Sequence, residues 1–283
     1  MNDIKETMDI KEWQTEAEIK KGNLTGLFKI YGKVIIAFSG GVDSTFMLKI
    51  ARDAIGDDVI AVTIRAPIFP TDESGFAEEF CRREGIEHRI IDVDILSHEE
   101  FVTNDKDRCY TCKKLLFEDV IKMGAELGII NMCEGSIVDD DDDYRPGKRA
   151  IKELGVLSPM KEVGLTKDEI RYLSKEMGLP TWDKPSMACL ASRFPYGNVI
   201  NKEQLLMVEE AEKYLMGLGF DQVRVRIHDD VARIEVATDS FEKIMMAETR
   251  EKIYDKLSGV GFGYVALDLK GYRTGSMNEA LGI

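Results

Sequence analysis

The sequence predicts an α/β protein with a doubly wound parallel sheet, followed by a smaller α+β domain. Short apolar runs alternate with helix-length segments up to about residue 180, which is the pattern of parallel strands covered by helices on both faces. A glycine-rich turn directly follows the first apolar run, at the strand end where such folds bind ligands. The composition then changes at the loop-rich stretch 180–197, after which strands and helices follow a different order.

The expected elements can be placed in order along the chain. Residues 1–31 are predicted to form a helix that docks through its apolar residues. Strands are expected at 34–38, 58–65, 88–95, 129–137 and 156–160, and helices after residue 45 and at 73–84, 113–127 and 166–177. The second domain is expected to contain helix 202–217, strands 222–228 and 231–237, helix 239–257 and strand 263–270. The resulting divisions are an N-terminal helical segment (1–32), a main domain (33–180), a cysteine loop (181–197) and a C-terminal substrate or oligomerisation domain (198–283).

Composition bounds the partners of the chain. Its 283 residues carry a net charge of −14, which argues against a nucleic acid as the main partner, because nucleic-acid binders usually have a basic balance. No apolar run approaches the roughly 20 residues that span a bilayer, and residues 1–21 lack the apolar core of a signal peptide. Five cysteines, an odd number, argue against a disulfide framework. We therefore expect a cytoplasmic protein that does not bind membranes.

The turn after the first strand is Ser39-Gly40-Gly41-Val42-Asp43-Ser44-Thr45. A strand, a glycine-rich turn and a helix in this order point backbone N–H groups and a helix N-terminus at an anion. The turn contains no lysine, and the GxxxxGK[ST] pattern of Walker-type loops is absent. The sequence therefore predicts a phosphate-binding loop of another kind.

This turn resembles the pyrophosphate loop of the ATP pyrophosphatase superfamily, which includes GMP synthetases, asparagine synthetases and tRNA thiolation enzymes. The resemblance implies that ATP is cleaved to AMP and pyrophosphate while a carboxylate or carbonyl oxygen is adenylated. The residues expected to hold ATP are Ser39, Gly40, Gly41, Val42, Asp43, Ser44 and Thr45. Asp43 is expected on the Mg²⁺ side, because Mg²⁺ binds carboxylates and phosphate oxygens. Arg145, which follows the acidic residues 139–143, is expected to neutralise phosphate charge.

Three of the cysteines lie in segments whose composition suggests a function. Cys109 and Cys112 form a CxxC among basic residues, a spacing shared by zinc, iron–sulfur and redox sites. Cys189 lies far along the chain in KPSMACLASRFPYG, with cations on either side. Three cysteines suit a [4Fe–4S] cluster whose fourth iron stays open, and zinc, which usually takes four ligands, is the alternative metal. Cys81 and Cys133 lie in a helix and an apolar strand and are expected in the core.

Taken over about residues 15–275, the chain resembles the LarE-type sulfur transferases. The resemblance is carried by SGGVDST, by the DD…DYRPG segment that ends at Gly147, by the cysteine loop, and by RVRIH with the later ARIE. It implies an enzyme that adenylates the carboxylates of pyridinium-3,5-biscarboxylic acid mononucleotide and converts them to thiocarboxylates for the nickel-pincer nucleotide cofactor. It also implies a homo-oligomer.

The family has two chemistries. In one, a single cysteine matching Cys189 gives up its sulfur and becomes dehydroalanine. In the other, three cysteines hold a [4Fe–4S] cluster that carries an extra sulfide, and sulfide or another donor resupplies it. The presence of Cys109 and Cys112 places this chain with the cluster-bearing form, in which Cys189 is both a ligand and the catalytic cysteine. The sacrificial route needs Cys189 alone and would leave the CxxC unexplained.

Arginines after the cysteine loop are candidates for the substrate phosphate. Arg224 and Arg226 alternate with apolar residues on a predicted strand and so face the same side as His228. Arginine binds phosphate bidentately, although cross-strand pairing with Glu235 is the alternative for these side chains. Further anion-binding candidates are Arg193 and Arg273.

Other functions remain open at this level. A tRNA thiolation enzyme shares the pyrophosphate loop, and some of these enzymes share a three-cysteine cluster. A synthetase that uses ammonia would need no cysteine, and a zinc-stapled nucleotide sensor would release no AMP. Tight, salt-sensitive binding of tRNA would favour the thiolation enzyme.

Overall fold

The computed structural model describes residues 10–71, 73–142, 146–185, 188–273 and 275–277. Contacts divide the chain into two compact units. Unit 1 consists of Met1–Arg65, Thr71–Val93 and Cys109–Ser186. Unit 2 consists of Ala66–Pro70, Asp94–Arg108 and Met187–Ile283. Cys109 and Cys112 therefore belong to unit 1 and Cys189 to unit 2.

The described part of unit 1 contains a parallel sheet in the order β3-β2-β1-β4. Its strands are β1 (Val34–Ala37), β2 (Val59–Arg65), β3 (Glu87–Asp92) and β4 (Asn131–Cys133). The apolar residues at the start of β1 and β2 are buried, which explains why these two strands are continuous apolar runs in the sequence. The arrangement confirms the predicted parallel α/β fold.

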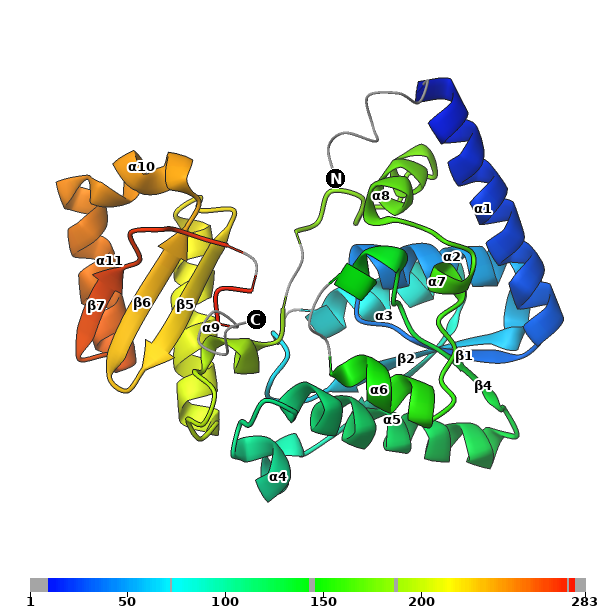
Figure 1. The fold of residues 1–283 in the computed structure, drawn as a ribbon, viewed down its shortest axis with the longest axis horizontal. Coiled ribbons are helices and arrows are strands. Elements are labelled where there is room, and N and C mark those ends of the chain that lie inside the picture. Colours follow the sequence, from blue (N-terminus) through cyan, green and yellow to red (C-terminus); the bar gives the residue numbers. More distant parts are fainter. Residues whose placement is uncertain (1–9, 72, 143–145, 186–187, 274, 278–283) are drawn as a thin grey trace. The chain divides into compact units, whose positions relative to one another are not determined.

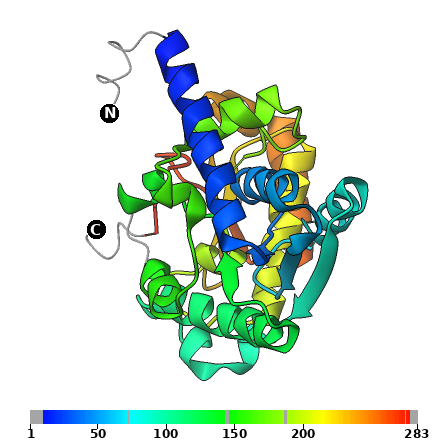
Figure 2. The same ribbon diagram turned by 90° about the vertical axis from the view of Figure 1, so that its right-hand side faces the viewer.

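Helices cover both faces of this sheet (Figures 1 and 2). They are α1 (Ile10–Tyr31), α2 (Val42–Ile55), α3 (Glu73–Glu84), α5 (Arg108–Leu127), α6 (Gly147–Glu153), α7 (Pro159–Glu162) and α8 (Lys167–Glu176). Successive residues of β1 enter opposite cores, as strand alternation requires. Val34 and Ile36 pack with residues of α1, α2, α3 and α8, whereas Ile35 packs with Phe117 and Val120 of α5. Both faces are therefore covered, as the doubly wound class demands.

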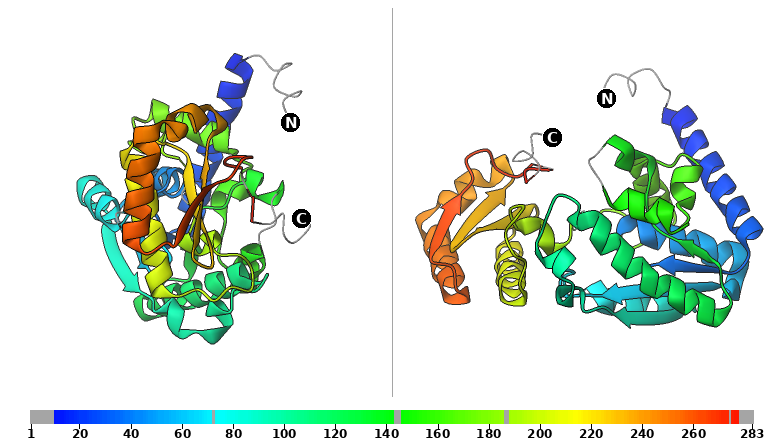
Figure 3. Two further views of the ribbon diagram at one scale, coloured as in Figure 1. Left: turned by 90° about the vertical axis from the view of Figure 1, so that its left-hand side faces the viewer. Right: turned by 60° about the horizontal axis from the view of Figure 1, so that its bottom comes forward.

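Unit 2 contains a mixed sheet in the order β5-β6-β7. Its described elements are α4 (Glu99–Val102), α9 (Lys202–Gly217), β5 (Val223–His228), β6 (Val231–Val236), α10 (Phe241–Met245), α11 (Ala247–Val260) and β7 (Tyr264–Leu267). The strands β5 and β6 form an antiparallel hairpin, and β7 pairs with β6 in parallel. In this unit α9 packs on β5 and α11 packs on β7 (Figure 3). This is the smaller α+β fold that the sequence predicts.

Several predicted boundaries are wrong, and each error has a local cause. Helix α5 begins at Arg108 rather than at 113, so the CxxC lies inside its first turn. The strand predicted at 129–137 is only Asn131–Cys133, because the chain turns away after Gly135 into a 3-10 segment, Val138–Asp142. The strand predicted at 156–160 is a single bridge from Cys133 to Leu157 followed by α7.

The helix predicted at 239–257 is also interrupted. Met246 has an extended backbone, with φ −57° and ψ 136°, and it separates α10 from α11. Among the described residues, no helix combines the length and the apolar character that crossing a membrane requires.

Candidate active site

The glycine-rich loop joins β1 to α2 at the carboxyl end of the sheet in unit 1. Gly40 has a φ of +71°, a left-handed conformation that a residue with a Cβ rarely adopts. Gly41 is the N-cap of α2 and makes no side-chain capping hydrogen bond. Because the first N–H groups of a helix lack partners within the helix, an uncapped N-terminus beside a glycine turn suits a phosphate.

Hydroxyl groups line the same turn. The Oγ atoms of Ser39 and Ser44 lie 3.1 Å apart, and the Ser44 hydroxyl is 3.3 Å from the Gly41 carbonyl oxygen. Thr45 is fully buried, and its Oγ1 has no hydrogen-bond partner among the described residues. A buried hydroxyl without a partner is costly, so Thr45 fits a site that a polar ligand completes.

Two lysines from distant segments supply the positive charge that the loop lacks in sequence. Lys167, the first residue of α8, places its Nζ 2.6 and 2.5 Å from the two carboxylate oxygens of Asp43. Lys184 donates from its Nζ to the Gly40 carbonyl oxygen at 3.1 Å. Sequence reasoning missed both residues, because no local pattern shows that α8 begins beside the loop.

The acidic segment after β4 is in part structural. Asp140 is buried, and its carboxylate accepts the backbone N–H of Ile137 at 2.9 Å. Asp139 accepts the backbone N–H of Lys167 at 2.9 Å and thereby fixes the start of α8. Arg145, which we expect to neutralise phosphate, lies outside the described residues.

The end of β4 lies between the loop and the CxxC helix. A Cβ built on Gly135 would be 3.7 Å from the Asp43 Cβ and from the Ser44 nitrogen. Glu134 is buried, and its carboxylate accepts the Ser158 hydroxyl at 2.6 Å. The Nζ of Lys113 lies 3.7 Å from the same carboxylate. Lys113 directly follows Cys112, so β4 connects the nucleotide loop to the CxxC turn.

The cysteines of unit 1 fall into two classes. Cys109 and Cys112 are partly exposed and stand three residues apart in the first turn of α5, on the same face of the helix. Cys81 and Cys133 are buried, and burial raises the pKa of each thiol to about 12. These two are the core cysteines that the sequence predicts. Within the part of the chain that the structure describes, no three His, Cys, Asp or Glu side chains form a metal-binding group.

In unit 2, Cys189 lies directly before a 3-10 turn, Leu190–Arg193, and is partly exposed. Arg193 is fully buried and pairs with Glu212, with Nε and Nη2 at 2.9 and 2.7 Å from its two oxygens. Its Nη1 donates to the carbonyl oxygens of Ala188 and Cys189 at 2.9 and 3.1 Å. Arg193 therefore fixes the backbone that carries Cys189, and its role toward a substrate phosphate stays a prediction.

The strand arginines of unit 2 are buried as well. Arg226 pairs with Glu235 at 3.1 and 2.9 Å and donates to the Ser192 carbonyl oxygen at 2.9 Å, so the alternative of cross-strand pairing holds for it. Burial, followed by the charge of Arg193, holds the pKa of Arg224 below its usual value. Arg273 lies 3.3 Å from Asp268 and donates to the Gly271 carbonyl oxygen. Phosphate binding by these residues stays a prediction.

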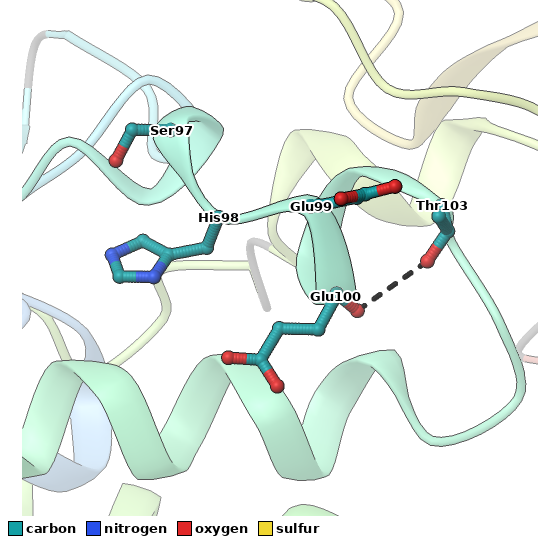
Figure 4. A pocket seen from close by; sticks show the side chains of 5 residues that line it. All are labelled: Ser97, His98, Glu99, Glu100 and Thr103. Carbon is teal, nitrogen blue, oxygen red and sulfur yellow. Dashed lines mark hydrogen bonds between the residues drawn. The ribbon is translucent and has the colours of Figure 1, made fainter.

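Unit 2 also has an open pocket of about 500 Å³ near α4 (Figure 4). It is lined by Ser97, His98, Glu99, Glu100 and Thr103. None of the residues predicted to act in the reaction lines it, so we assign it no role in the chemistry.

The parallel sheet and its uncapped glycine loop define a nucleotide-binding α/β protein of the pyrophosphate-loop class. The family model described as queuosine biosynthesis protein QueC matches residues 33–110. A pyridinium-3,5-bisthiocarboxylic acid mononucleotide synthase of Lactiplantibacillus plantarum is 37% identical, over 93% of this chain and 95% of its own. An uncharacterised protein of Synechocystis is 38% identical over 93% and 98%. The chain belongs to the family of the LarE-type synthases, within the ATP-using pyrophosphate-loop proteins.

More distant relatives share only the first part of the chain. The tRNA-specific 2-thiouridylase MnmA of Rickettsia felis is 26% identical over 60% of this chain and 57% of its own. A glutamine-hydrolysing GMP synthase component of Thermoplasma volcanium is 27% identical over 55% and 54%. These partial matches are typical of a shared nucleotide domain with different second domains.

Proposed function

We propose that the protein uses ATP to convert the carboxylates of pyridinium-3,5-biscarboxylic acid mononucleotide to thiocarboxylates. The observation that carries this proposal is the uncapped glycine loop, in a chain that matches a named synthase over 93% of its length. Each turnover adenylates one carboxylate, releases pyrophosphate, and then exchanges AMP for sulfur. The product would serve the nickel-pincer nucleotide cofactor.

The loop residues account for the first half-reaction. The N–H groups at the start of α2 and the hydroxyls of Ser39, Ser44 and Thr45 bind the phosphates. Asp43 holds Mg²⁺ through its carboxylate, since carboxylate and phosphate oxygens are the usual ligands of this ion. Lys167 then leaves Asp43 and neutralises the charge that develops on the departing pyrophosphate. The paired Lys167 and Asp43 and the Thr45 hydroxyl without a partner fit such a site.

The cysteines account for the second half-reaction. Cys109 and Cys112 share one helix face, and with Cys189 they form the thiolate donor set that suits a [4Fe–4S] cluster with one open iron. When bound, the cluster supplies a sulfide that is deprotonated and placed near the acyl group. Arg193 holds the backbone of Cys189 through its carbonyl oxygen. Arg145, Arg193, Arg224, Arg226 and Arg273 remain our candidates for the mononucleotide phosphate.

An anaerobic assay tests this function. Protein purified without oxygen is incubated with the mononucleotide, ATP, Mg²⁺ and sulfide, and products are identified by mass spectrometry. We expect the thiocarboxylate together with AMP and pyrophosphate, iron in the protein, and an unchanged protein mass. Loss of the mass of one sulfur from Cys189 would instead support the sacrificial route. Absence of AMP with this substrate would overturn the proposal.

A second candidate is tRNA thiolation, which the partial match to MnmA favours. The net charge of −14 opposes it. A gel shift with total tRNA separates the two: tight, salt-sensitive binding would support thiolation of tRNA. A cytoplasmic location and a homo-oligomer complete our proposal, and cell fractionation and light scattering test them.

A further inference from the structure

Helix α6 approaches the CxxC turn more closely than a side chain would allow. A Cβ built on Gly147 would lie 3.1 Å from the carbonyl oxygen of Cys109 and 2.9 Å from the Cγ of Lys113. Contacts this short require a neighbour to move, and the backbone of a helix moves little. Glycine at this position therefore lets the start of α6 lie directly against the first turn of α5.

The residue between the two cysteines is held from the same helix. The Tyr110 hydroxyl donates to Glu153 Oε2 at 2.6 Å. The guanidinium of Arg149 stacks 4.0 Å from the centre of the Tyr110 ring, and its Nε lies 3.8 Å from Glu153. One face of α6 thus contacts Tyr110 through both the ring and the hydroxyl. Neither Tyr110 nor α6 has a part in the reaction described so far.

These contacts act on the least stable part of α5. The first turn of a helix opens more readily than its middle, and its N–H groups lack partners within the helix. Two thiols three residues apart share one side only while that turn is formed. Opening it by one turn would turn one sulfur away from the other, which a shared metal centre does not tolerate.

We propose that α6 is a brace for the CxxC turn, with Tyr110 and Glu153 as positioning residues that keep Cys109 and Cys112 on one side. The role of the two thiols as ligands rests on the proposed function, whereas the brace itself does not. The same contact accounts for the glycine that follows Arg145-Pro146 in the sequence. The brace lowers the cost of ordering the two thiols when a metal binds.

The test uses the full-length, iron-free protein and two measurements. The first is hydrogen exchange of the backbone amides in the peptide that covers 108–116. The second is Cd²⁺ affinity, followed by the thiolate-to-metal absorption band, with Cys109→Ser/Cys112→Ser defining the signal of the pair. The probe variant is Tyr110→Phe, which keeps the ring and removes the hydroxyl. The matched control is Tyr31→Phe, since Tyr31 also donates to a glutamate, Glu162 Oε2 at 2.8 Å.

For Tyr110→Phe we expect amide exchange in the CxxC turn to be about fivefold faster, the ratio expected for the loss of one hydrogen bond. Cd²⁺ should bind the pair more weakly by about the same factor, because each binding event must then close the turn. Glu153→Gln, which keeps an acceptor oxygen, should lie between Tyr110→Phe and the unaltered protein. Tyr31→Phe should leave both measurements unchanged.

Two results would overturn the brace. One is an unchanged exchange rate and Cd²⁺ affinity in Tyr110→Phe. The other is an equal effect of Tyr31→Phe, which would mean that any loss of stability loosens the turn. Because no sulfur transfer is measured, failure here leaves the proposed function standing. Conversely, a failed sulfur-transfer assay leaves this measurement valid.

Discussion

Removing the Lys167 ammonium by Lys167→Met tests the charge arrangement at the nucleotide loop. Without nucleotide, Lys167 pairs with both oxygens of Asp43, and the two side chains are 33% and 26% exposed. Exposed pairs contribute roughly 0–1 kcal/mol, and breaking a fully buried pair costs roughly 3–5 kcal/mol. This half-buried pair lies between these limits, so we expect the free energy of unfolding to fall by about 1–2 kcal/mol.

The effect on catalysis should be larger than the effect on folding. If Lys167 neutralises the departing pyrophosphate, its loss removes an interaction made mainly in the transition state, and kcat should fall about 100-fold. The KM for ATP should change much less, because the loop N–H groups remain. Pyrophosphate release in the presence of the mononucleotide measures both constants, and urea unfolding measures stability.

The control is Lys49→Met, on the same helix α2. Lys49 lies 2.7 Å from Asp53 and 3.2 Å from Glu84, so it is also a lysine between carboxylates. It is remote in sequence from the loop, and its loss should affect stability alone. A kcat for Lys167→Met within about threefold of the unaltered enzyme would refute the assigned role. So would a loss of kcat in Lys49→Met as large as that in Lys167→Met.

Four further predictions follow from the geometry. Gly40→Ala should weaken ATP binding about tenfold, measured by calorimetry, because alanine disfavours a φ of +71°. Arg193→Met should lower the free energy of unfolding by about 3–5 kcal/mol in urea titrations, because it leaves the Glu212 charge buried and unpaired. Cys189→Ser should abolish thiocarboxylate formation while pyrophosphate release with hydroxylamine as acyl acceptor continues. Burial lowers the pKa of His88, so below its usual pKa the unfolded chain binds more protons. Stability should therefore fall as pH drops below about 6.5, and His88→Gln should flatten this dependence.

The nucleotide loop could be predicted from sequence because its determinants are local. Gly40 needs its positive φ, and Gly41 leaves the helix N-terminus uncapped. Both properties belong to neighbouring residues between one apolar run and one helix. The parallel sheet was predictable for a similar reason, since strands buried on both faces are apolar without alternation.

The cations of the site could not be predicted in this way. Lys167 and Lys184 reach the loop across 124 and 144 residues of sequence. Their position depends on where α8 begins relative to β1, which follows from the packing of the whole unit. Asp139 contributes by accepting the Lys167 N–H. A lysine at the start of an amphipathic helix is common, so its sequence context carries no signal of this contact.

The strand arginines show how a correct pattern leaves the partner undetermined. Period-two alternation places Arg224 and Arg226 on one face, but the register of the hairpin decides what they meet. Arg226 stands opposite Arg233 and reaches Glu235 diagonally. A one-residue shift of that register would move Glu235 to the other face. Only the folded hairpin, with its turn at Asp229, fixes this choice.

Stability alone does not explain the buried arginines around Cys189. Arg193 and Glu212 are 0% and 4% exposed, and Arg226 and Glu235 are 7% and 0% exposed. Such pairs gain little net free energy, because desolvation offsets their attraction. Their remaining N–H groups, however, donate to the carbonyl oxygens of Ala188, Cys189 and Ser192. Apolar residues of the same size would fill the volume without holding these carbonyls, so the two ion pairs are better understood as the fixed frame of the cysteine loop.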